Sequence, residues 1–89
     1  MKIYLITRKD LPVGAYRTRD AAKEAALSKA AEGVKFTDHA WTYSAGVDGD
    51  GRRTQVEDGP SLDRAELSYR SARRWINSGY VIDSTELHA

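Results

Sequence analysis

The sequence predicts an α+β fold, in which a small antiparallel or mixed sheet of four or five strands carries two helices on one of its faces. Three observations support this prediction. Apolar runs rich in β-branched and aromatic residues stand near both ends of the chain, at residues 3–6 and 80–82. Two longer segments between them have the apolar spacing of helices, and each is followed by a glycine. A turn-rich cluster at residues 46–51 separates two further segments of strand character.

Length and composition predict one globular domain over residues 1–89, because the chain is long enough for a single modest core and no segment is biased enough to be disordered. The absence of cysteine excludes disulfides, thiolate metal ligands and a cysteine nucleophile. A formal net charge of +1 excludes both the strong positive field of a histone-like binder and the acidic surface of a DNA mimic. The apolar run 3–6 is too short for a signal peptide or a membrane span, so we expect a cytoplasmic protein.

The first third of the chain predicts a strand, a hairpin and a helix. Residues 3–6 are apolar on both alternating faces, which is typical of a strand covered on two sides or lying centrally, and we place this strand at residues 2–8. Residues 13–17 predict a short second strand that pairs back on the first, and its presence decides between the orders βαββαβ and ββαββαβ. Thr18 is then the N-cap of an alanine-rich helix over residues 19–32. The expected buried side of this helix consists of Ala22, Ala26, Leu27 and Ala30.

The middle of the chain predicts a hairpin. Residues 36–44 alternate apolar and polar side chains, with one slip near residues 37–38 that suits a bulge, and therefore predict a strand. The glycine- and aspartate-rich residues 46–51 predict the turn, and residues 52–57 are strand-like but polar. We expect this second strand to lie exposed at an edge of the sheet.

The segment from Pro60 to Gly79 predicts the second helix. Ser61 is a suitable N-cap because its hydroxyl can accept a hydrogen bond from a first-turn amide, and Gly79 can adopt the left-handed conformation that ends a helix. Residues 80–87 follow as the closing strand, which completes a variant of the ferredoxin-like arrangement. At the helical period one buried stripe is formed by Leu62, Ala65, Tyr69, Ala72 and Ile76.

No motif for catalysis, cofactor binding or metal binding accompanies these elements, so we expect neither an enzyme nor a cofactor. The Asp-Gly-Asp-Gly run at residues 48–51 begins like a calcium loop. However, Arg52, Arg53 and Gly59 stand where such a loop needs an oxygen ligand, a glycine and a glutamate, so a hairpin turn is the better interpretation. An enzyme centred on His39 is a remote alternative, because no spacing brings a carboxylate or a nucleophile to that imidazole.

The second predicted helix carries a basic, partly apolar surface beside its buried stripe. Leu67, Arg70 and Arg74 lie together on the helical wheel, with Arg64 and Trp75 further round. Arginine and tryptophan dominate binding hot spots, because a planar guanidinium and a large ring give contact area at low entropic cost. The alternative is a solvated face, on which Arg70 pairs with an acidic residue one turn earlier. The predicted partner-binding residues are Arg64, Leu67, Arg70, Arg74 and Trp75, together with Arg52 and Arg53 near the turn.

The N-terminal third resembles the opening of many small phage-encoded proteins. The pattern consists of residues 1–7, then residues 14–18, followed by the alanine-rich helix that begins at Arg19. The resemblance implies an anti-defence function of the anti-CRISPR kind, in which a compact protein binds a host nucleoprotein complex and blocks a surface or a step. It implies no functional residue, because such proteins share no motif.

These observations lead to one main hypothesis and two alternatives. The main hypothesis is a non-enzymatic binding protein, encoded by a phage or a mobile element, that inhibits or modulates a host protein or nucleoprotein complex by surface contact. The first alternative is a small nucleic-acid-binding domain that uses the arginine-rich helix face, and the second is the enzyme centred on His39. No membrane contact is expected, and either predicted edge strand, 52–57 or 80–87, can pair two copies as a homodimer.

Overall fold

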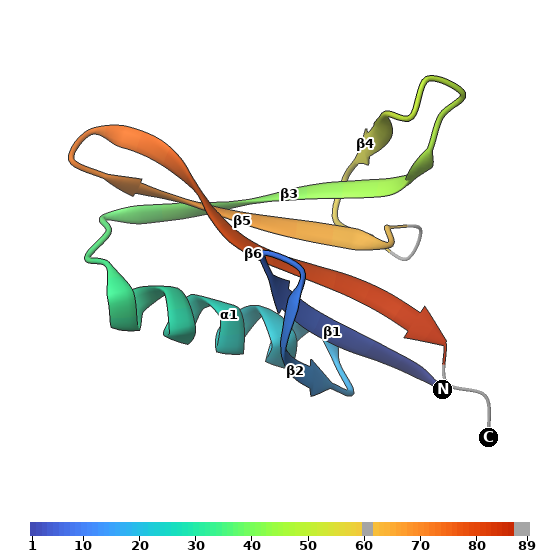
Figure 1. Ribbon diagram of the computed structural model, residues 1–89, viewed down its shortest axis with the longest axis horizontal. Helices are drawn as coiled ribbons and strands as arrows, with labels where there is room; N and C mark the ends of the chain where they lie inside the picture. Colours follow the sequence, from blue (N-terminus) through green and yellow to red (C-terminus); the bar gives the residue numbers. More distant parts are fainter. Residues whose placement is uncertain (60–61, 87–89) are drawn as a thin grey trace.

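The computed structural model describes residues 1–59 and 62–86, which form a six-stranded antiparallel sheet with one helix packed against one face (Figure 1). In chain order the elements are β1 (Lys2–Arg8), β2 (Leu11–Tyr16), α1 (Arg19–Gly33), β3 (Asp38–Val47), β4 (Arg53–Val56), β5 (Arg64–Ser71) and β6 (Arg74–Glu86). The strands lie in the order β2-β1-β6-β5-β3-β4, so β2 and β4 are the edges. Helix α1 connects the β2 edge to β3, near the other side of the sheet.

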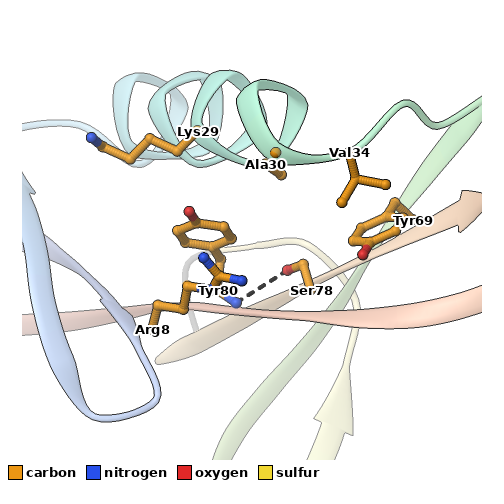
Figure 2. A pocket seen from close by; sticks show the side chains of 8 residues that line it. Arg8, Lys29, Ala30, Val34, Tyr69, Ser78 and Tyr80 are labelled. Carbon is orange, nitrogen blue, oxygen red and sulfur yellow. Dashed lines mark hydrogen bonds between the residues drawn. The ribbon is translucent and has the colours of Figure 1, made fainter.

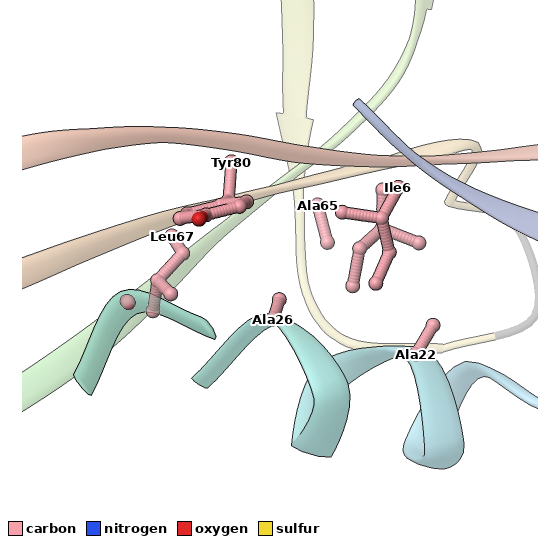
Figure 3. Packing of buried hydrophobic residues seen from close by; sticks show 8 residues of the cluster. Ile6, Ala22, Ala26, Ala65, Leu67 and Tyr80 are labelled. Carbon is pink, nitrogen blue, oxygen red and sulfur yellow. The ribbon is translucent and has the colours of Figure 1, made fainter. Parts of the chain in front are cut away.

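Helix α1 forms where the sequence predicts it. Thr18 is extended (φ −126°), and its Oγ1 accepts a hydrogen bond from a first-turn backbone N–H at 3.1 Å, so the predicted N-cap is confirmed. Ala22, Ala26 and Ala30 are the buried residues of the helix, whereas Leu27 packs at the margin and is half-buried. Because methyl side chains let the helix axis approach closely, α1 packs directly on the sheet (Figure 3).

The core lies between α1 and the middle of the sheet. Ile6 of β1, Leu67 of β5 and Ile82 of β6 are its largest fully buried side chains, and Tyr80 is also buried. Figure 3 shows Ile6, Leu67 and Tyr80 facing the alanine side of the helix. A single helix with an alanine face makes this core thin, so each large side chain in it contributes much of the stability.

The opposite face of the sheet is open, since α1 is the only helix of the described residues and lies on one side (Figure 1). Strand alternation places Leu5 of β1 and Glu66 of β5 on this open face, and both are half-exposed. Arg64 pairs with Asp83 of β6 here, and its Nε donates a hydrogen bond to Asp83 Oδ1 at 2.8 Å. That bond raises the pKa of Arg64, because it stabilises the charged guanidinium.

The second predicted helix is wrong, and so is the fold with two helices on four or five strands. The segment forms β5 and β6, an antiparallel pair joined by a two-residue turn. In β5 the side chains of Ala65, Leu67 and Tyr69 face the helix at a period of two. β5 forms hydrogen bonds with both neighbouring strands and buries Leu67. The free energy gained by this pairing and burial exceeds the differences in helix propensity between ordinary residues, which are at most about 0.7 kcal/mol per residue. The predicted cap Ser61, with Pro60 before it, lies outside the described residues.

Gly79 has the predicted left-handed conformation (φ +82°), but it lies inside β6 and not at the end of a helix. The register shifts at this point, so that residues 78–80 of β6 stand opposite Leu67 of β5 as a bulge. Ser78 Oγ donates a hydrogen bond to the Leu67 carbonyl oxygen at 2.7 Å and accepts one from the Tyr80 N–H at 3.1 Å. The bulge therefore keeps both Ser78 and Tyr80 on the buried side of β6.

The remaining predicted strands are present. β1 has the predicted bounds, β2 pairs with it as a hairpin, and β3 is displaced towards the C-terminus relative to the predicted strand 36–44. β4 pairs only with β3, which confirms the polar edge strand expected within residues 52–57. The closing strand predicted for 80–87 is the second half of β6, and residue 87 lies outside the described residues. The prediction that this strand is an edge able to pair two copies is wrong, because β6 lies between β1 and β5. The ferredoxin-like interpretation is wrong, because the described residues hold one helix and six antiparallel strands.

Candidate contact site at the tip of the β5–β6 hairpin

The structure brings three of the seven predicted partner-binding residues together. Arg70, Arg74 and Trp75 lie at the tip of the β5–β6 hairpin, which forms one end of the molecule (Figure 1). Leu67 is 0% exposed, so it is not available to a partner. On a helix it would stand beside Arg70, but in a strand residues three apart point to opposite faces.

The other three predicted residues lie elsewhere. Arg64 is on the open face of the sheet, in the ion pair described above. Arg52 and Arg53 belong to the β3–β4 hairpin, at the other end of the 42 Å long axis (Figure 1). Arg53 Nε donates a hydrogen bond to Ser44 Oγ at 2.8 Å, and its guanidinium forms an ion pair with Asp63. Arg64 and Arg53 are therefore engaged inside the protein.

The tip is closed by a two-residue turn of Ala72 and Arg73. Ser71 pairs with Arg74 across this turn, and φ is positive at both turn residues, 50° for Ala72 and 66° for Arg73. Positive φ at both central positions is the type I′ geometry that matches the twist of a hairpin, but it costs a residue with a Cβ about 1–2 kcal/mol. The turn thus holds an arginine in a conformation that glycine or asparagine adopts more easily.

Side chains at the tip are distributed over both faces of the two-stranded ribbon. Arg70 pairs directly with Trp75, so these two share the open face of the sheet. Arg74 lies on the other face. On that face, nearer the sheet, the Tyr69 ring stacks on Phe36 with ring centroids 5.5 Å apart. The ring pair supports the base of the two-stranded ribbon, while the tip of the ribbon projects into solvent.

The tip is exposed and positively charged. Arg70, Arg73 and Arg74 are exposed, and Trp75 leaves 53% of its surface to solvent. Within residues 1–59 and 62–86, none of the three guanidinium groups makes a hydrogen bond or an ion pair. Asp38 of β3 pairs with Arg70 in the register, but its Oδ1 accepts the next backbone N–H at 2.8 Å. Three cations and one indole therefore face solvent together.

The β3–β4 connection is a hairpin turn organised by one carboxylate. Asp48 Oδ1 accepts hydrogen bonds from the backbone N–H groups of Asp50 and Arg52, each at 2.9 Å, which is the bonding of an Asx turn. The carboxylate is thus used by its own loop. In the part of the chain that the structure describes, no group of three or more His, Asp or Glu side chains is positioned to hold a metal ion.

His39 lines an open groove of about 420 Å³ between α1 and β3, together with Asp20 and Glu24. The groove is bordered by Lys23, whose Nζ donates a hydrogen bond to the Tyr43 hydroxyl at 2.7 Å. Among the described residues, no carboxylate or nucleophile forms a hydrogen bond with the His39 imidazole. The geometry therefore lends no support to an enzyme centred on this residue.

A second, smaller pocket lies between the C-terminal half of α1 and the β6 bulge (Figure 2). Figure 2 shows Lys29 of the helix above Tyr80, with the hydrogen bond between Ser78 and Tyr80 below. The pocket volume of about 40 Å³ has room for a few water molecules, whereas ligand sites measure about 300 Å³ or more. It is a gap beside the bulge that is too small for an organic ligand of ordinary size.

Comparison with known proteins identifies no relative, since no family model, no curated protein and no solved structure matches this chain. No helix in the described ranges is long and apolar enough to span a membrane. A functional assignment therefore depends on the hairpin tip itself.

Arg73 is the tip residue that sequence reasoning missed, because a helix over this segment places it in the last turn with no special exposure. The signal that locates it is the alternation of polar and apolar side chains from Arg64 to Ser71, which has the period of a strand. A strand that ends at Ser71 and a second one that begins at Arg74 leave only two residues for the turn.

Proposed function

We propose that this protein is a small non-enzymatic binding protein that attaches to a larger host assembly, a protein or nucleoprotein complex, and thereby inhibits or modulates it. The contact surface is the tip of the β5–β6 hairpin. The observation that carries the proposal is that three arginines without partners in the described residues and the exposed Trp75 lie together at one hairpin tip.

Energetic reasoning supports the tip as a contact surface. An arginine with no internal partner keeps its five donors for a ligand, whereas an arginine in an ion pair must first lose that pair. The strand pairing already fixes the backbones of Trp75 and Arg70 side by side, so binding of a partner has only their side chains left to order. Residues of these two types are enriched among the few that carry most of the binding energy in known interfaces.

The anti-defence role rests on the resemblance of residues 1–7 and 14–18 to the opening of small phage-encoded proteins. The tip is compatible with that role, because a projecting hairpin can enter a groove of a large complex and block it. Inhibition by surface contact needs no catalytic group.

The experiment is an affinity capture from a lysate of the organism in which the gene resides, with the full chain as bait. The tip variant carries Arg70→Glu and Arg74→Glu. The matched control carries Arg17→Glu and Arg52→Glu, which change the net charge by the same amount at exposed arginines away from the tip. Both variants are checked for folding by circular dichroism.

We expect the wild-type chain and the control to retain a common partner that the tip variant loses. Retention of every partner by the folded tip variant would overturn the proposal. Equal loss from both variants would show that net charge, and not the hairpin tip, governs binding.

A further inference from the structure

We propose that the hairpin tip binds single-stranded nucleic acid, holding phosphates with its arginines and stacking a base on Trp75. This inference rests on the proposed function, because it takes the tip to be the contact surface and names the chemistry of the partner. It joins two observations: the local positive charge and the accessible indole.

The positive charge is local, and none of its guanidinium groups forms an ion pair within residues 1–59 and 62–86. The whole chain carries a formal charge of only +1, yet three of its arginines stand within five consecutive residues, at Arg70, Arg73 and Arg74. Ser71 Oγ donates a hydrogen bond to the carbonyl oxygen of Lys35 at 3.1 Å, which brings a fourth cationic residue next to the hairpin. Asp38 is the acidic residue that faces this group across the strand register. A polyanion is the ligand that such a cluster attracts.

The exposed Trp75 indole favours single-stranded nucleic acid among the possible polyanions. Trp75 lies directly opposite Arg70, and directly opposed Cβ atoms in an antiparallel pair are about 4.5–5.5 Å apart. A base that stacks on the indole therefore brings its phosphates within reach of the Arg70 guanidinium. An unpaired base offers its whole ring to an aromatic side chain, whereas the bases of a duplex are stacked on one another.

The arrangement predicts binding that is tolerant of sequence and sensitive to salt. Every base has a ring face, so stacking on Trp75 does not select among bases. Each phosphate neutralised on a single strand contributes about −0.7 to the slope of log K against log salt, so three arginines give a slope of about −2.

The test uses the full chain and a fluorescein-labelled single strand of about 20 nucleotides, long enough to cover a site of this kind. Fluorescence anisotropy is measured over about 0.05–0.2 M salt, and a duplex of the same sequence is measured in parallel. The chain has only two tryptophans, so a Trp41→Phe background makes the intrinsic fluorescence report on Trp75.

The expected result is binding of the single strand, weaker binding of the duplex, and quenching of Trp75 on titration. Trp75→Ala is expected to weaken binding about 5- to 150-fold, and Arg70→Gln and Arg74→Gln to reduce the salt slope by about 0.7 each. Arg52→Gln, at the other end of the molecule, is expected to change neither quantity. Circular dichroism of each variant shows whether a loss of binding comes from unfolding.

Three results would overturn the inference: no binding at the lowest salt, tighter binding of the duplex, or unchanged affinity in folded Trp75→Ala. The first result separates it from the proposed function. If the lysate partner survives nuclease treatment and still depends on Arg70 and Arg74, the tip binds a protein. If neither the oligonucleotide nor a lysate partner depends on these residues, both proposals fail.

Discussion

Two hairpins at opposite ends of the sheet both carry arginines, but only the β5–β6 hairpin gathers several unpaired guanidinium groups together with an exposed tryptophan. In the β3–β4 hairpin, Arg53 is bound to Ser44 and Asp63. In the β5–β6 hairpin, the guanidinium groups of Arg70 and Arg74 have no partner among the described residues. An arginine that is paired with a carboxylate of the same chain stabilises the fold, whereas an arginine without a partner is available to a ligand. Counting arginines in the sequence does not separate these two cases.

The substitution with the greatest expected loss of stability distinguishes the core from the contact surface. Leu67→Ala removes a fully buried side chain beneath α1 and is expected to lower the free energy of unfolding by about 2–5 kcal/mol. Urea denaturation followed by circular dichroism measures this change. Arg70→Ala is the comparison in the same strand and is expected to alter stability by less than about 0.5 kcal/mol. Similar costs for the two variants would contradict the assignment of Leu67 to the core.

A smaller loss is expected at the bulge that precedes the buried half of β6. Gly79→Ala places a Cβ on a residue with φ +82°, which is expected to cost about 1–3 kcal/mol of stability. The new Cβ would meet Arg8 Cγ at 3.6 Å, an ordinary contact, so the cost comes from the backbone and not from a clash. Thermal unfolding of Gly79→Ala beside Gly33→Ala, whose Cβ meets nothing within 4 Å and whose φ is not positive, tests this reasoning. Equal melting temperatures would argue against the bulge.

Substitution of the turn residue Arg73 by glycine is expected to raise the stability of the fold and to weaken binding. Arg73→Gly relieves the positive φ of 66° and should raise the free energy of unfolding by about 1 kcal/mol. The same change removes one of the three cations at the tip and should weaken binding of the partner. Thermal unfolding and a binding titration on one preparation give both quantities. A variant that gains both stability and affinity would show that Arg73 takes no part in the contact.

The smallest expected effect concerns the arginine that is already paired. Arg53→Gln loses the hydrogen bond to Ser44 and an ion pair whose two side chains are partly exposed, at 27% and 45%, so solvent screening limits the cost of the lost ion pair to about 0–1 kcal/mol. Binding of the partner should be unchanged, in contrast to Arg70→Gln. If Arg53→Gln weakened binding as much as Arg70→Gln, the distinction between the two hairpins would be lost.

Sequence reasoning succeeds where local signals determine the structure. Thr18 and the four-residue spacing of Ala22, Ala26 and Ala30 predict α1, because capping and burial both act within one segment. The strand at β1 and the polar edge at β4 are likewise readable from composition and alternation.

The same reasoning fails at β5 and β6, because the deciding contacts join distant parts of the chain. Ala65 and Tyr69 fit a helical stripe as well as a strand face, and only pairing with β3 and β6 selects the strand. The turn Ala72-Arg73 contains no glycine or asparagine, so the usual hairpin signal is missing. Gly79 serves a bulge, but its left-handed conformation is equally typical of a helix end.

Some of the predicted site residues lie together in the structure although the predicted helix is wrong, and the reason is geometric. Arg70 and Arg74 are four apart, which makes them neighbours on a helix. A two-residue turn between Ser71 and Arg74 makes the same residues neighbours in a hairpin, and it also sets Arg70 against Trp75. Leu67 does not lie beside them, because alternation along the strand places its side chain on the buried face.

The most direct measurement is hydrogen–deuterium exchange of the full chain, free and bound to the assembly captured from the lysate. We expect new protection over residues 69–76 at the β5–β6 tip and no change over residues 47–53 at the β3–β4 turn. Protection confined to residues 47–53, or to α1 with the tip unchanged, would show that the tip is not the contact surface.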